Sequence, residues 1–244
     1  MKFPALHLTT SLLAVLSLCQ VAAADVKLKQ AKVIIEHNAT DSDTGFQISL
    51  DADGWQKLEL TGPAGPVAQF QPLGQIEGLG MTELFLETVE PANSKMPLAT
   101  ILAKMPEGVY KFRATASAEG GASGEMTGTA TLSHKIPQGV TLLSPKEDAV
   151  IAVADTNVAW SGNGLNLDGS KADIIAYQLI IEKDEEPHPR MVGKRGLSMI
   201  LPANVQNITI AEVFFEAATK YKWEVLAIAD NGNQTLQSGA FKTK

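Results

Sequence analysis

The chain has 244 residues, of which 20 are Lys or Arg and 27 are Asp or Glu, so its net charge at neutral pH is −7. An acidic protein repels the phosphate backbone, and we therefore expect no nucleic acid partner. Cys19 is the only cysteine in these 244 residues, which excludes an intrachain disulfide and a metal centre built from several thiolates.

The N-terminal segment has the pattern of a cleavable secretory signal. Lys2 precedes an apolar stretch from Leu12 to Leu18, and the small residues Ala22 and Ala24 follow it. We expect cleavage after Ala24, which makes residues 1–24 a signal peptide. The apolar stretch is much shorter than the roughly 20 residues of a membrane-spanning helix, so we expect no transmembrane segment in the mature chain. A mature chain without cysteine favours a bacterial protein, either periplasmic or secreted.

Lipid anchoring at Cys19 is an alternative interpretation of the same segment. A bacterial lipoprotein signal needs a small residue directly before the acylated cysteine, and Leu18 stands there instead. Cleavage after Ala24 is therefore the favoured prediction, and lipidation at Cys19 stays open.

Most of the remaining chain alternates apolar and polar residues with period two, and clusters of Gly, Pro, Asn and Asp interrupt it at short intervals. This pattern is typical of antiparallel β structure packed as a sandwich. Pro137, Gly139 and Pro145 interrupt the alternation, which restarts near Val140. We therefore predict an all-β protein with two β-sandwich domains, residues 25–138 and 139–244.

Residues 38–55 contain four aspartates and raise the question of a calcium site. An EF-hand loop needs an oxygen ligand at position 5 and Glu at position 12. Counting from Asp41 places Gly45 at position 5, and counting from Asp51 places Trp55 there. Both registers fail, so the sequence does not contain an EF-hand.

A strand followed by a tight turn explains this stretch better. Phe46, Ile48 and Leu50 alternate with polar residues, and Asp53-Gly54 is a strong signal for a two-residue hairpin turn. We predict that the aspartates mainly form turns by accepting bonds from nearby backbone amides. A calcium site shared between Asp41, Asp43 and a distant carboxylate is the alternative that stays open.

One short segment departs from the β pattern. Leu98, Ile101, Leu102 and Met105 fall on one helical face, and Pro106 follows them. The spacing predicts a short helix that has Pro97 in its first turn, ends at Pro106 and covers one end of the first sandwich.

The segments PEGVYKFRATA and GEMTGTATLSH predict a hairpin near the end of the first half. Tyr110, Phe112, Ala114 and Ala116 share one face of its first strand. This pair of strands resembles the closing hairpin of a bacterial immunoglobulin-like domain. The resemblance implies an immunoglobulin-like sandwich with the short helix as an insertion.

The second half resembles a fibronectin type III domain over about 105 residues. The resemblance rests on the LLSP opening, the NVAW strand with Trp160, the AYQLIIEKD strand with Tyr177, and ATKYKWEVLAIADNGNQT around Tyr221. It implies a tyrosine corner at Tyr221, in which the phenol hydroxyl bonds back to the backbone, and a central core position for Trp160. The segment from Asp230 to Asn233 has the composition of a hairpin turn.

Familiar catalytic patterns do not occur in this sequence. It has no Gly-x-Ser-x-Gly, His-Glu-x-x-His or phosphate-binding Gly-x-x-x-x-Gly-Lys segment. His37, His134 and His188 are far apart, and we predict that each lies in a solvated loop. We therefore expect no cofactor, and we assign no catalytic, cofactor-binding or metal-ligating residue.

These patterns predict an exported, non-catalytic interaction or accessory module that binds an envelope protein or a polysaccharide through loops or an edge strand. The groove between the domains and the charged segment of residues 182–195 are the first places to examine. A calcium-dependent carbohydrate or adhesion module is the alternative, and a carboxylate-based hydrolase is a weaker one. The sequence leaves the partner, the oligomeric state and the rigidity between the domains open.

Overall fold

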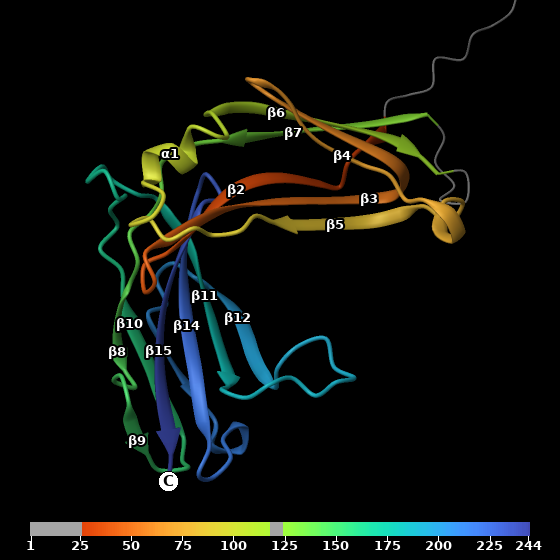
Figure 1. The fold of residues 1–244 in the computed structure, drawn as a ribbon. Helices are drawn as coiled ribbons and strands as arrows, with labels where there is room; N and C mark the ends of the chain where they lie inside the picture. The colour runs from red at the N-terminus through yellow and green to blue at the C-terminus, as the bar shows by residue number, and fades with distance from the viewer. Residues whose placement is uncertain (1–25, 118–123) are drawn as a thin grey trace, which may run out of the picture.

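The computed structural model describes residues 26–117 and 124–244, and these residues form mostly β-strands (Figure 1). The predicted signal peptide and Cys19 lie outside the described residues. Among the described residues, no helix is both long and apolar enough to span a membrane.

The first part of the chain contains seven strands and one α-helix. They are β1 (Val26–Lys27), β2 (Gln30–Asn38), β3 (Asp43–Gly62), β4 (Gly65–Phe70), β5 (Met81–Glu87), α1 (Leu98–Leu102), β6 (Gly108–Ala116) and β7 (Glu125–Leu132).

The second part contains eight strands. They are β8 (Thr141–Ser144), β9 (Ala149–Ile151), β10 (Thr156–Ser161), β11 (Ile174–Lys183), β12 (Gly196–Pro202), β13 (Asn207–Ile210), β14 (Lys220–Ala229) and β15 (Gln234–Thr243).

One long hydrogen-bonded path of strands runs through both parts. Its order is β1-β7-β6-β3-β2-β15-β14-β11-β12, while β4 and β5 pair with β3, β9 pairs with β15, and β13-β10-β8 form a separate small sheet. The path passes between the parts where β2 and β15 pair in parallel, from Glu36 opposite Gln234 to Asn38 opposite Leu236. Figure 1 shows the two parts meeting at a corner beside this pair.

Two separate hydrophobic cores lie on either side of this corner. The residues of the first core fall between Leu28 and Ile136, and those of the second fall between Val140 and Phe241. Apolar and polar residues alternate along the strands, and every second side chain of a strand points to the same face. This alternation places apolar side chains in both cores.

The predicted hairpin turn at Asp53-Gly54 is wrong, because β3 continues through it as a single strand of 20 residues. Gly54 has φ of 123°, which glycine tolerates, and the pairing register of β3 shifts between Asp51 and Trp55. Asp53-Gly54 therefore forms an irregularity within a strand. The part of β3 before it pairs with β2 and β5, and the part after it pairs mainly with β4 and β6.

The predicted helix is confirmed, although α1 itself spans only Leu98–Leu102. Two further turn bonds, from Lys104 N to Ile101 O and from Met105 N to Leu102 O, extend the coil toward Pro106. Ile101 and Met105 are buried in the first core, as their shared helical face predicts.

Both predicted hairpins are confirmed, since β6 pairs with β7 and β14 pairs with β15 in antiparallel registers. Trp160 is buried as predicted. The Tyr221 hydroxyl accepts a hydrogen bond of 2.8 Å from the backbone N–H of Glu216, which confirms the tyrosine corner. Tyr110 makes a similar contact in the first part, where its hydroxyl donates to the carbonyl of Pro106 at 2.9 Å.

Candidate functional site

Three carboxylates from different parts of the chain meet beside the corner. Glu36 lies in β2, Glu87 ends β5, and Glu90 follows in the segment after it. One carboxylate oxygen from each lies within 4.8 Å of the other two. We refer to Glu36, Glu87 and Glu90 as the carboxylate cluster.

Strand register brings the cluster together. Glu36 pairs with Gly45 across β2 and β3, and Glu87 pairs with Gln47 across β3 and β5. Gly45 has no side chain, and a Cβ there would lie 2.8 Å from Cγ of Glu90. The bare backbone at Gly45 therefore provides the space into which Glu90 folds.

Two glutamine side chains donate hydrogen bonds to part of the cluster. Nε2 of Gln47 donates to Oε2 of Glu36 at 2.7 Å and to Oε1 of Glu87 at 2.8 Å. Nε2 of Gln234, at the start of β15, also donates to Oε2 of Glu36. Oε1 of Glu90, in contrast, is buried without a hydrogen-bond partner among the described residues.

Burial and mutual repulsion change the protonation of the cluster. Burial first, and then the charges of Glu36, Asp43 and Glu87, raise the pKa of Glu90 to about 7. Burial also raises the pKa of Glu36, with Gln234 opposing the shift. At an effective dielectric constant of about 20, two unit charges at 4.8 Å repel by about 3.5 kcal/mol. A bound cation or a proton relieves this repulsion.

The cluster has the donor chemistry of a site for a hard cation. Ca²⁺ binds carboxylate and amide oxygens in flexible geometry, whereas Mg²⁺ demands a nearly ideal octahedron. Oε1 of Glu90, buried without a hydrogen-bond partner among the described residues, fits such an ion. Glu36, Glu87 and Glu90 are the residues that would hold it.

The structure separates the two aspartates of the predicted calcium alternative. Asp41 is exposed, and its Oδ2 accepts a bond of 3.0 Å from the side-chain Nδ2 of Asn38. The backbone amides of Thr40 and Asp41 donate to Oδ1 of Asn38, so Asn38 has the turn role that we predicted for Asp41. Among the described residues, Oδ1 of Asp43 is buried without a hydrogen-bond partner, and burial raises the pKa of this carboxyl. The charge of Asp43 also contributes to the raised pKa of Glu90.

The prediction of a solvated loop is wrong for His37. His37 lies in β2, is 7% exposed, and its Nδ1 lies 2.9 Å from Oγ1 of Thr44. Burial lowers its pKa, while contacts with Asp43 oppose this shift. His134 lies outside the strands and is half-buried, with Nε2 2.9 Å from the carbonyl of Met105. His188 is exposed in a loop, as predicted.

The charged segment of residues 182–195 begins at the end of β11 and forms an exposed loop before β12. Its base is tied by ion pairs, because Arg195 contacts Glu185 at 2.7 Å and the buried Lys183 pairs with Glu216. A surface cavity of about 440 Å³ lies beside it, lined by Glu185, Glu186, Pro187, His188, Met191 and Arg195. The structure brings no part of the carboxylate cluster into this cavity.

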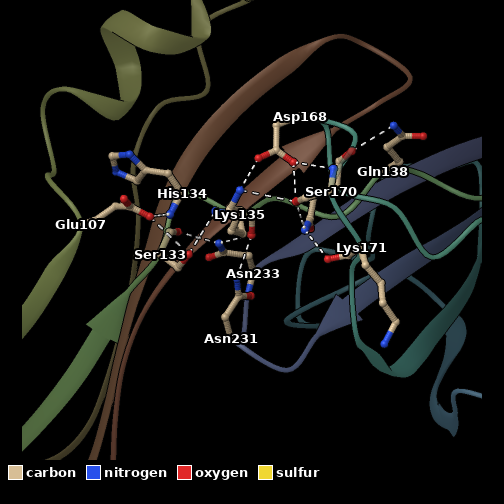
Figure 2. A network of polar contacts seen from close by, with 11 residues as sticks. Glu107, Ser133, His134, Lys135, Gln138, Asp168, Ser170, Lys171, Asn231 and Asn233 are labelled. Carbon is tan, nitrogen blue, oxygen red and sulfur yellow. Dashed lines mark hydrogen bonds and ion pairs between the residues drawn. The ribbon is translucent and has the colours of Figure 1, made fainter.

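Where we predicted a groove between the two halves, hydrogen bonds join residues of both halves (Figure 2). Nδ2 of Asn233 donates to the carbonyls of Ser133 and Lys135 at 2.7 and 2.8 Å, and its Oδ1 accepts from N of Ile35 at 2.8 Å. Asn233 is fully buried. A surface cavity of about 240 Å³ is lined by Thr40 of the first half and otherwise by residues of the second half.

Comparisons with known proteins give likenesses at the level of structure. No family model matches the sequence, and no curated protein matches it. The chain is similar to a segment of two fibronectin type III domains from chicken tenascin, with a TM-score of 0.30 and 10% identity, over 88% of this chain and 98% of that one. It is also similar to the FN1-FN3 domains of chicken CNTN1, with a TM-score of 0.33 and 9% identity, over 90% of this chain and 65% of that one.

Proposed function

We propose that this chain is an exported, non-catalytic interaction or accessory module that binds an envelope protein or a polysaccharide through loops or an edge strand. The proposal places it in the bacterial periplasm or outside the cell after removal of residues 1–24. It includes two sandwich domains, an immunoglobulin-like one in residues 25–138 and a fibronectin type III-like one in residues 139–244.

Matching features in the two parts support this domain organisation. Each part has its own hydrophobic core, and each has a hairpin of long strands near its end. Tyr110 and Tyr221 lie near the start of the first strand of each hairpin, and both hydroxyls bond to backbone a few residues upstream. A tyrosine in this place is typical of immunoglobulin-like sandwiches.

The observation that carries the binding function is the presence of exposed apolar side chains on strands with an unpaired edge. β12 ends the main path of strands, and its Ile200 is 70% exposed. Among the described residues β5 pairs only with β3, and its Phe85 is 64% exposed. Natural proteins normally blunt or cover such edges, so an exposed apolar edge indicates a surface that a partner covers.

Crosslinking in living cells tests this function. A photoreactive residue placed at Phe85 or Ile200 is expected to capture a specific envelope protein, or bound polysaccharide, whereas one placed at the exposed Lys104 is not. Equal labelling at all three positions, or labelling at none of them, contradicts the proposal.

A calcium-dependent carbohydrate or adhesion module is the second candidate, and the carboxylate cluster favours it. Calcium at about 1 mM, the affinity range of extracellular modules, is expected to raise Tm, because a ligand that binds only the folded state stabilises it. The Glu90→Gln variant is expected to lose this response. A wild-type Tm that calcium leaves unchanged contradicts this candidate.

A carboxylate-based hydrolase has less support. Its acid and base would have to face a cavity that admits a substrate. Five surface cavities among the described residues, with volumes of about 240 to 450 Å³, are lined by residues other than Glu36, Glu87 and Glu90.

A further inference from the structure

We propose that the unpaired edge of β5, together with the exposed face formed by Glu83, Phe85 and Glu87, binds an extended, positively charged peptide segment of a partner protein by strand addition. This inference rests on the proposed interaction function and names the strand and the chemistry of the partner. Glu83, Phe85 and Glu87 are called the β5 face below.

The two sides of β5 have opposite characters. Leu84 and Leu86 pack against the first hydrophobic core, as alternate residues of a half-buried strand do. Glu83, Phe85 and Glu87 point the other way and are all exposed. Phe85 is 64% exposed and is not among the residues that form the first hydrophobic core. Aromatic residues are the commonest anchors of protein interfaces, so Phe85 has the character of an anchor.

The backbone of β5 is also available for pairing. β5 is seven residues long, and among the described residues its only strand partner is β3, at whose side it forms the outermost strand (Figure 1). Edge strands are usually protected by proline, lysine or a bulge. The sequence of β5, MTELFLE, contains neither proline nor lysine. An added strand would therefore meet regular unpaired backbone groups, as in other cases of strand addition.

Charge identifies the chemistry of the partner. Residues 81–94, which include all of β5, contain three glutamates and no basic residue. Asp51 lies opposite Glu83 on β3, and Gln47 lies opposite Glu87, so the neighbouring strand adds negative charge and no positive charge at these positions. A cationic segment is complementary to this surface, and an acidic one is repelled.

The spacing along β5 specifies the pattern within that segment. Side chains on one face of a strand recur every second residue, about 7 Å apart. Directly opposite side chains on neighbouring strands form the interacting pairs. The order Glu83, Phe85, Glu87 therefore fits a partner strand with a basic residue, an apolar residue and a basic residue at alternate positions.

The other exposed edge lacks this charge pattern. The corresponding residues on β12 are Ser198, Ile200 and Pro202, of which none is charged and one is proline. Strand addition of a basic segment is therefore expected at β5 and not at β12. This difference supplies the control for the experiment.

Peptide binding tests the inference directly. The probes are two acetylated synthetic peptides, TKTLTKT and TETLTET, titrated against the full chain by isothermal calorimetry or fluorescence anisotropy. We expect the lysine peptide to bind, with an affinity that falls as salt is raised, and the glutamate peptide not to bind. Glu83→Lys with Glu87→Lys is expected to weaken binding of the lysine peptide at least tenfold and to permit binding of the glutamate peptide. Phe85→Ser is expected to weaken binding of the lysine peptide about tenfold, and Ile200→Ser is expected to leave this binding unchanged.

The outcomes separate this inference from the broader function. All substituted residues are exposed, and a cooperative thermal melt shows that each variant is folded. Failure of the lysine peptide to bind, or equal binding to every variant, overturns the inference. If a photoreactive residue at Ile200 still captures the envelope partner in the Phe85→Ser variant, the interaction function stands and the β5 face is the wrong surface. A concentration-dependent dimer that Phe85→Ser abolishes overturns the inference in favour of a second copy of this chain.

Discussion

Glu90 occupies the space that a side chain on Gly45 would fill, because its Cγ lies 2.8 Å from the position of a Cβ at Gly45. Gly45 lies opposite Glu36 in the β2–β3 register. The absence of one side chain on β3 thus allows a third carboxylate to join the two that the strand register places nearby. The cluster depends on this glycine as much as on its acids.

Gly45→Ala is expected to displace Glu90 from the cluster. The added methyl group also meets Oγ1 of Thr88 at 3.0 Å, so relief requires movement of the segment after β5. We expect a loss of about 1 to 3 kcal/mol in the free energy of unfolding, typical of overpacking, together with loss of any calcium-dependent rise in Tm. Gly193→Ala is the matched control, because a Cβ at Gly193 meets nothing within 4 Å. A variant that keeps both its stability and its calcium response contradicts this account.

Stability is expected to fall as the pH rises from about 4.5 to about 7. The pKa of Glu90 is raised from 4.5 to about 7, mainly by burial, so the folded protein retains a proton over this range that the unfolded chain releases. When the folded state binds more protons, each increase in pH favours unfolding. Glu90→Gln removes this ionisation, so at pH 8 without calcium the variant is expected to melt at a higher temperature than wild type. Each kcal/mol gained in the free energy of unfolding is expected to raise Tm by about 2 to 4 °C.

Thermal melts at several pH values from 4 to 8 measure this effect. Glu77→Gln, which removes an exposed carboxylate outside the cluster, serves as the control. The interpretation of the cluster is wrong if Glu90→Gln melts below wild type at pH 8, or if the two proteins show parallel pH dependence.

The sequence predicted much of the fold because burial in a strand alternates with period two. The predicted core position of Trp160 and the predicted turn from Asp230 to Asn233 are both present. The same local signals could not distinguish a turn at Asp53-Gly54 from an irregular strand, because Gly54 permits positive φ in either case. Only the neighbours of β3, which change along its length, decide between them.

The carboxylate cluster was beyond prediction for a related reason. Glu36 and Glu87 belong to strands that flank β3, and their proximity follows from two independent registers. A shift of one residue in either register would turn one of them to the opposite face. His37 was mispredicted because the position of the strand end, and hence its burial beside Thr44, depends on where the β2–β3 turn begins.

Asn233 is expected to be a major contributor to the junction between the two parts. Its side chain makes three bonds to backbone groups of the first part, including N of Ile35, and it is fully buried. Asn233→Ala leaves buried polar groups without partners, each at a cost of about 1 to 3 kcal/mol. We expect the free energy of unfolding to fall by about 2 to 4 kcal/mol and the amide of Ile35 to exchange faster with solvent.

Urea unfolding and amide hydrogen exchange measure these effects, with Asn207→Ala as the control. Asn207 is exposed in β13, so its substitution is expected to change stability by no more than about 0.5 kcal/mol. Unchanged stability together with unchanged exchange at Ile35 in Asn233→Ala contradicts this role of Asn233.

Tyr110 and Tyr221 make opposite kinds of hydrogen bond, and their substitution is expected to have unequal effects. Tyr221→Phe removes the acceptor from the N–H of Glu216, whereas Tyr110→Phe removes the donor to the carbonyl of Pro106. A carbonyl with two lone pairs tolerates the loss of one partner better than an N–H does. We expect losses of about 1 to 2 kcal/mol for Tyr221→Phe and about 0.5 to 1 kcal/mol for Tyr110→Phe, measured by urea unfolding. Each ring stays in its core in these variants, so a larger loss for Tyr110→Phe contradicts the assignment of the two bonds.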